Sequence, residues 1–303
     1  MMTSRTPGRP TPLLSLVLAG ALALAGVLAA PVRAQEDVPG DPYDEAVPQT
    51  PEQIIEERGE HEMVLIHGLG SNADIWDECL PFLKGTFKVW TFELAGHGHT
   101  QPIVDPTIAK ETERLRTFIK EQGIVYPTLV GHGMGGMIAL QYSVDHPADV
   151  SRLIVLDAAP MQLASLEQKA AVGQELANNY DQYIYSRFIN MTPNQEVTDR
   201  VLDTALRTDS ATFISLLMSS FDFDLSGKLY SLPVPMLVVG SQLMFPGQGH
   251  SKDQLETYGF GKARALSFKR MGGTGHFMML ERPIYLASVL LAFGKSAEVQ
   301  FDR

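Results

Sequence analysis

The sequence is short of cysteine, of basic residues and of long apolar runs, and each shortage excludes a class of protein. Its 303 residues include a single cysteine, Cys79, so a framework of intramolecular disulfides is excluded. The 24 Lys and Arg residues are outnumbered by 35 Asp and Glu residues, which gives a formal charge of −11. This balance disfavours nucleic acids and anionic membrane surfaces as partners. We interpret Cys79 as a buried apolar residue, because no base or second thiol accompanies it.

The one long apolar run lies near the N-terminus. Residues 1–34 have a positively charged start, an apolar stretch over residues 13–30 and small residues before Gln35, the pattern of a secretory signal peptide. A retained membrane anchor is the alternative, because about 18 apolar residues is the lower limit for spanning a bilayer. We therefore expect an exported protein, periplasmic or extracellular. Residues 35–60 are acidic and contain prolines, which is typical of a flexible tether.

From residue 61 to residue 303 we expect one domain in which strands alternate with helices. Short apolar runs predict strands at 63–67, 88–94, 127–132, 152–158, 235–241 and 264–271. Helical patterns lie between them, at 107–122, 134–146 and 282–294. This alternation predicts an α/β fold, with a doubly wound, mostly parallel sheet covered on both faces. Residues 161–230 carry amphipathic helical sequence without a convincing strand, so we expect a helical lid over the carboxyl ends of the strands.

A glycine-rich stretch, "GHGMGG" at residues 131–136, follows one predicted strand and begins a helix. This is the setting of the nucleophile elbow G-x-S-x-G, but the central residue is Gly133, which has no hydroxyl group. The elbow strains its central residue by about 1 to 3 kcal/mol, and glycine relieves that strain. The stretch therefore allows two interpretations: a catalytic turn that has lost its nucleophile, or a tight turn that needs small residues.

Several motifs together resemble the α/β-hydrolase fold superfamily. They are "HGLGSNADIW" (67–76), "FELAGHGHT" (92–100), "GHGMGG" (131–136), "LIVLDAAP" (153–160), "PMLVVGS" (235–241) and "GTGHFMMLERP" (273–283). Their order and spacing are most similar to those of the lidded esterases and carbon–carbon-bond hydrolases. The resemblance covers roughly residues 62–294. It implies that His276 is the base and that the N–H groups of Leu69 and Met134 form the oxyanion hole.

The same resemblance indicates that two members of the catalytic triad are missing. The nucleophile position falls on Gly133, and the usual acid position falls on Leu243, or on Gln242 by a second count. Asp157 is a possible substitute acid, although an aspartate in "LDAAP" more often caps the following loop. We therefore expect His276 to lack an orienting carboxylate. On that basis, Gly133→Ser alone would restore little activity, and adding Leu243→Asp would restore far more.

The remaining histidines invite a metal-site interpretation that their spacing does not favour. They include His67, His97, His99, His132 and His250, and none shows H-x-x-x-H spacing or a partnered acidic pattern. The resemblance implies loop packing for three of them, His67, His97 and His132. We expect neither a metal nor a cofactor.

Two functions remain open at this point. The first is an exported, non-catalytic protein that uses its lidded pocket to bind an apolar small molecule or a partner. The second is an enzyme that hydrolyses a small ester, thioester or carbonyl compound through water activated by His276. Weak activity alone would not separate them, because binding and oxyanion stabilisation leave about 10³ to 10⁴-fold acceleration in serine proteases stripped of their triad.

Overall fold

A computed structural model describes residues 61–161, 164–246 and 251–295. The predicted signal peptide at 1–34 and the predicted tether at 35–60 lie outside the described residues. Within the described part of the chain, no helix is both long enough and apolar enough to cross a bilayer.

Six parallel strands form one sheet, in the order β2-β1-β3-β4-β5-β6. The strands are β1 (Glu62–Ile66), β2 (Lys88–Phe92), β3 (Thr128–His132), β4 (Arg152–Leu156), β5 (Met236–Ser241) and β6 (Leu266–Met271). Each coincides with a run expected from the sequence, so the α/β fold class is confirmed. Strands β1, β3, β4 and β5 are buried along their whole length, as in parallel sheets with both faces covered.

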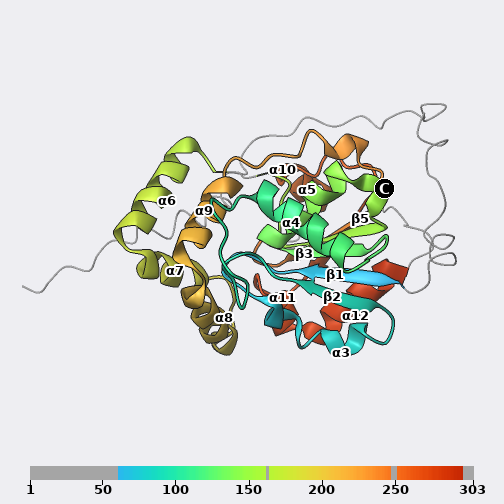
Figure 1. Cartoon of the computed structure of the whole chain (residues 1–303), viewed down its shortest axis with the longest axis horizontal. Helices are drawn as coiled ribbons and strands as arrows, with labels where there is room; N and C mark the ends of the chain where they lie inside the picture. The colour runs from blue at the N-terminus through green and yellow to red at the C-terminus, as the bar shows by residue number, and fades with distance from the viewer. Residues whose placement is uncertain (1–60, 162–163, 247–250, 296–303) are drawn as a thin grey trace, which may run out of the picture.

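Two hydrophobic cores lie on opposite faces of the sheet, because successive side chains of a strand point to opposite sides. In β1, Met63 and Leu65 belong to one core, and Val64 and Ile66 belong to the other. Helices α4 (Ile108–Glu121), α5 (Met134–Asp145) and α10 (Ser251–Thr257) lie on one face, and helices α3 (Leu80–Leu83), α11 (Met278–Glu281) and α12 (Pro283–Lys295) lie on the other (Figure 1). Short 3-10 helices lie between these elements, at Ala73–Trp76, Pro147–Asp149 and Leu229–Ser231.

Four consecutive helices fill the region between β4 and β5. They are α6 (Leu166–Asn178), α7 (Tyr180–Phe188), α8 (Gln195–Arg207) and α9 (Ser210–Ser220), and Figure 1 shows them gathered at one end of the sheet. Side-chain caps start them: Ser165 forms a capping box with Gln168, and Asn194 and Asp209 accept from the first turns of α8 and α9. The region is therefore helical as expected, and its role as a lid stays a prediction.

The strand order places a topological switch point at the carboxyl ends of β1 and β3. We refer to the space between the loops that follow these two strands as the crevice. From β1 the chain moves outward to β2, whereas from β3 it moves the other way to β4. The loops that follow β1 and β3 therefore diverge, and open α/β sheets bind ligands at such a switch point. The two loops are those that carry "HGLG" and Gly133.

Candidate active site

Gly133 occupies the sharp turn between β3 and α5. Its backbone has φ 52° and ψ −118°, a conformation that residues with a side chain rarely adopt. The N–H of Gly133 donates to Leu156 O at 2.9 Å, and its carbonyl accepts from the N–H groups of Gly136 and Met137. Gly135 is needed for close approach, because a Cβ atom there would lie 2.4 Å from Ile66 O. The turn therefore has the geometry that the elbow pattern predicts.

Position 133 faces His276, the base that the sequence predicts. A Cβ atom on Gly133 would lie 3.3 Å from His276 Nε2 and 3.8 Å from Gly68 Cα. A side chain at this position would thus point into the crevice between His276 and the loop after β1. The structure brings Gly133 and His276 together as expected, although 143 positions separate them in the sequence.

Asp157 supplies the carboxylate that His276 was expected to lack. His276 Nδ1 lies 3.1 Å from Asp157 Oδ2, and the Asp157 side chain is only 1% exposed. A carboxylate accepts, so Nδ1 carries the proton and the lone pair of Nε2 faces position 133. The expectation that His276 has no orienting acid is therefore wrong. The local pattern "LDAAP" is typical of an aspartate that caps a loop, whereas the fold places the end of β4 beside the loop that carries His276.

Ser241 holds the Asp157 carboxylate in place. The Ser241 N–H donates to Oδ1 and its hydroxyl donates to Oδ2, both at 2.6 Å. Asp157 itself has a left-handed φ of 45°, a strained conformation for a residue with a side chain. Its own N–H donates to Val239 O. Bonds from β5 therefore fix a carboxylate at the end of β4, and no local sequence pattern predicts this role of Ser241.

The loop after β5, where the family resemblance places the acid, contacts the backbone of the histidine loop instead. Gln242 Oε1 accepts from Gly273 N at 2.6 Å, and Gln242 N donates to Thr274 O at 3.1 Å. Leu243 is half-buried and has no group that could orient an imidazole. This loop is therefore consistent with the prediction that Leu243 has no acid function. It hydrogen-bonds to Gly273 and Thr274, which lie shortly before His276 in the chain.

The backbone of His276 is tied to two further elements. Its N–H donates to Met191 O, in the segment between α7 and α8, at 2.6 Å. Its carbonyl accepts from His132 Nε2 at 3.0 Å. Because His132 directly precedes Gly133, this bond connects the loop of His276 to the turn. Met191 was not predicted at the site, whereas His132 belongs to the glycine-rich stretch that predicts the turn.

Leu69 and Met134, the expected oxyanion donors, flank the crevice. Met134 is the first residue of α5, so its N–H has no acceptor within the helix and lies at the positive end of the helix dipole. Leu69 lies in the loop after β1, next to Gly70. Gly70 packs beneath the helices α7 to α9, because a Cβ atom there would lie 2.8 Å from Phe188 and 3.0 Å from Phe213. Their role as an oxyanion hole stays a prediction.

The buried histidines make hydrogen bonds with the backbone. Burial lowers the pKa of His67 to about 3 and that of His97 to about 4, and it lowers the pKa of His132 well below its usual value. In the described residues no group of three or more His, Cys, Asp or Glu side chains could hold a metal ion, and His250 lies outside them. Cys79 is buried, which raises its thiol pKa to about 12.

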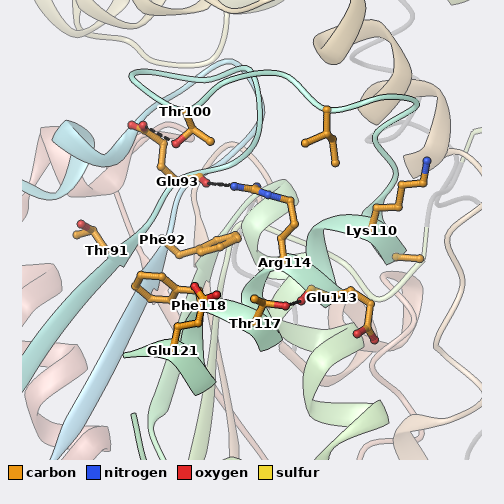
Figure 2. A pocket seen from close by; sticks show the side chains of 12 residues that line it. Thr91, Phe92, Glu93, Thr100, Lys110, Glu113, Arg114, Thr117, Phe118 and Glu121 are labelled. Atoms are coloured by element: carbon orange, nitrogen blue, oxygen red, sulfur yellow. Dashed lines mark hydrogen bonds between the residues drawn. The ribbon is translucent and has the colours of Figure 1, made fainter. Parts of the chain in front are cut away.

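A separate groove of about 820 Å³ lies beside the edge strand β2 and helix α4. Its lining includes Phe92 and Phe118, and Figure 2 shows Arg114 reaching from α4 toward the Glu93 carbonyl. None of its lining residues belongs to the crevice at Gly133. The Glu93 carboxylate faces the loops near that crevice, where it accepts from Ala73 N and His99 N.

Comparison with known proteins supports a hydrolase fold. Residues 63–289 match the Alpha/beta hydrolase family. The chain is similar to a pimeloyl-[acyl-carrier protein] methyl ester esterase of Edwardsiella ictaluri, 30% identical over 36% of this chain and 40% of that protein. It is also similar to a putative carbamate hydrolase RutD of Yersinia enterocolitica, 31% identical over 41% of this chain and 46% of that protein. These matches span less than half the length of either relative.

Solved structures show the same architecture at low sequence identity. An esterase from Exiguobacterium antarcticum superposes with a TM-score of 0.68 at 17% identity, over 78% of this chain and 93% of that chain. An enol-lactonase from Burkholderia xenovorans gives a TM-score of 0.67 at 17% identity, with the same coverage of 78% and 93%. At these identities the likeness establishes the fold alone.

Proposed function

Because the chain belongs to the alpha/beta hydrolase family, we propose that it hydrolyses small ester, thioester or related carbonyl compounds, with water in place of the absent serine. The observation that carries this proposal is the pair formed by His276 and Asp157, which directs the Nε2 lone pair toward position 133. A histidine oriented in this way is a general base for a nucleophile that is not part of the chain.

The reaction follows from the positions of these groups. His276 Nε2 takes a proton from water while the water oxygen adds to the carbonyl carbon. The N–H groups of Leu69 and Met134 stabilise the oxyanion of the tetrahedral intermediate. The intermediate then breaks its bond to the leaving alcohol or thiol, which receives the proton from Nε2. The Asp157 carboxylate stabilises the imidazolium throughout.

Glycine at position 133 leaves space of a suitable size for this water. A serine side chain would project toward His276 Nε2, because the Cβ position lies 3.3 Å from that atom. The missing CH₂OH group is comparable in size to a water molecule, which takes about 30 Å³ in the liquid. Nε2 and the N–H groups at the start of α5 give such a water polar neighbours.

The surroundings and the relatives favour an apolar ester-like substrate. Phe188 and Phe213 of the predicted lid pack against Gly70, next to the proposed oxyanion donor. Two similar proteins are named for the hydrolysis of a methyl ester and of a carbamate. The signal-like pattern of residues 1–34 adds the proposal that the protein acts outside the cytoplasm.

One observation favours a second candidate, a non-catalytic binding protein. Gly133 removes the nucleophile and at the same time relieves the strain of a turn at φ 52°. A scaffold selected for binding would gain stability from this residue and lose nothing that it uses. The crevice beneath α6 to α9 would then hold an apolar small molecule or a partner.

A screen of small esters and thioesters on the purified protein tests the proposal when His276→Ala is measured beside it. We expect weak turnover in the unmodified protein and a loss of about 10² to 10⁴-fold in His276→Ala, the usual contribution of a general base. Asp157→Asn should also lose activity, because the imidazole would no longer hold the required tautomer. His99→Ala is the matched control, because His99 is exposed.

Dependence on His276 decides between the two candidates. Equal turnover in the unmodified protein and in His276→Ala would contradict water activation and would leave only passive oxyanion stabilisation. Ligand-induced thermal stabilisation without any turnover would support the binding protein instead.

A further inference from the structure

Two buried histidines connect the loop after β1 to the loop after β2. His67 and His97 are both fully buried, and their ring centroids lie 5.3 Å apart. Leu94 N–H donates to His67 Nε2 at 3.1 Å, and Gly70 N–H donates to His97 Nε2 at 3.0 Å. Each imidazole thus accepts a backbone N–H from the loop that carries the other histidine.

The other nitrogen of each ring fixes its tautomer. His67 Nδ1 lies 2.8 Å from Gly68 O, and His97 Nδ1 lies 2.7 Å from Ala95 O. A carbonyl oxygen only accepts, so both Nδ1 atoms carry the proton and both Nε2 atoms present a lone pair. Burial disfavours a second proton on either ring.

These bonds fix the two peptide groups on either side of Leu69. The Gly68 carbonyl, which accepts from His67, shares one planar peptide group with the Leu69 N–H. The next peptide group ends in the Gly70 N–H, which His97 holds. Ser71 N also donates to Gly68 O at 3.2 Å. The direction of the Leu69 N–H is therefore set by His67 from one side and by His97 from the other.

The loop that carries His97 is itself anchored. The Glu93 carboxylate accepts from the Thr100 hydroxyl at 3.1 Å (Figure 2). It also accepts from His99 N at 2.8 Å and from Ala73 N at 3.2 Å. The Ala95 N–H is directed at Glu111 Oε2 at 3.4 Å. These bonds hold the loop after β2 in place, and that loop in turn holds the loop after β1.

We propose that His67 and His97 are positioning residues that form a reciprocal clasp and aim the Leu69 N–H into the crevice at Gly133. The inference rests on the proposed function, in which that N–H stabilises the oxyanion. The clasp contributes no proton to the reaction. It keeps one donor fixed before substrate arrives, which is the property that makes such donors effective.

The first test uses the unmodified protein and needs no activity. Nitrogen-15 NMR of the histidine side chains should report the Nδ1–H tautomer for both buried rings at neutral pH. An Nε2–H tautomer at either ring would overturn the clasp, because that nitrogen could no longer accept the N–H of the opposite loop.

A second test compares two replacements of similar length. His97→Gln keeps an oxygen acceptor for Gly70 N–H, whereas His97→Met offers at best a weak one. Hydrogen exchange at Leu69 and Gly70 should be about tenfold faster in His97→Met than in His97→Gln, beyond any change in global stability. Equal exchange in the two variants would contradict the clasp, and exposed His99→Gln serves as the control.

A third test measures how well the Leu69 N–H stabilises the oxyanion, in a Gly133→Ser background. The maximal rate of labelling by a fluorophosphonate should fall about 10 to 100-fold with His97→Met, less than the 10² to 10³-fold loss on removing a donor altogether. Its half-saturating concentration should stay unchanged, and His97→Gln should recover most of the rate. If only the half-saturating concentration changed and the maximal rate did not, His97 would have a merely structural role. If the unmodified protein proves inactive, the proposed hydrolysis fails while the tautomers and the exchange rates still decide the clasp.

Discussion

Replacing Gly133 with serine tests whether the crevice still holds a working base. The new Cβ atom would lie 3.3 Å from His276 Nε2, so the hydroxyl attached to it comes within reach of the imidazole. Asp157 already orients that imidazole from the other side, at 3.1 Å. We therefore expect the single substitution Gly133→Ser to create a reactive serine. Because Asp157 already contacts His276, we expect Leu243→Asp not to be needed, contrary to the expectation from sequence.

The stability cost of this substitution follows from the backbone. A residue with a side chain at φ 52° and ψ −118° is strained by about 1 to 3 kcal/mol. The contact of its Cβ with the His276 ring is tight and requires a shift of a few tenths of an ångström. Typical domains have 5 to 15 kcal/mol of stability, so we expect Gly133→Ser to fold with a lowered midpoint in urea.

Labelling by a fluorophosphonate, followed by intact mass, measures the gain. Gly133→Ala is the matched control, because it carries the same backbone strain without a hydroxyl. We expect covalent labelling of Gly133→Ser at one site and none of Gly133→Ala or of the unmodified protein. Adding Asp157→Asn should slow the labelling by about 10⁴-fold, the cost of the equivalent change in a serine protease.

Two outcomes would refute this reasoning. A folded Gly133→Ser that stays unlabelled would mean that His276 and Asp157 do not act as a base in this crevice. Strong rescue only after addition of Leu243→Asp would mean that the acid belongs after β5, and that the contact between Asp157 and His276 has no catalytic value.

Two further predictions concern the buried polar groups. The pKa of His97 lies at about 4 in the folded protein against 6.5 for an ordinary histidine, so its contribution to stability is complete above pH 6.5 and is lost as the pH falls toward 4, by about 3 kcal/mol. The ionisable groups that face it are Glu93, Asp209, Arg114 and His67. Unfolding in urea at pH 7 and pH 4 should therefore show a smaller acid loss in His97→Gln, and equal losses would contradict burial of a neutral ring. Ser241→Ala should lower the unfolding free energy by about 1.5 to 3 kcal/mol, because a buried carboxylate loses a hydroxyl donor, whereas exposed Ser231→Ala should change it by less than about 0.5 kcal/mol.

The sequence by itself determined the elements and the turn at Gly133. Apolar runs of four to eight residues and helical periodicity are local signals, and each strand of the sheet fell within two residues of its predicted run at either end. The elbow was equally readable, because a strand, a glycine-rich turn and a helix follow one another directly in the chain. The absence of a hydroxyl at position 133 is likewise a fact of sequence alone.

Tertiary structure decided which side chains meet at the crevice. Asp157 and His276 are 119 positions apart, and no local pattern distinguishes an aspartate that caps a loop from one that orients a base. The distinction arises because β4 pairs with β5, which brings the end of β4 beside Ser241 and the histidine loop. The reciprocal bonds of His67 and His97 have the same origin, since β1 and β2 are neighbours in the sheet. Hydrogen bonds between loops depend on strand order and on distances in space, and periodicity along one chain carries neither.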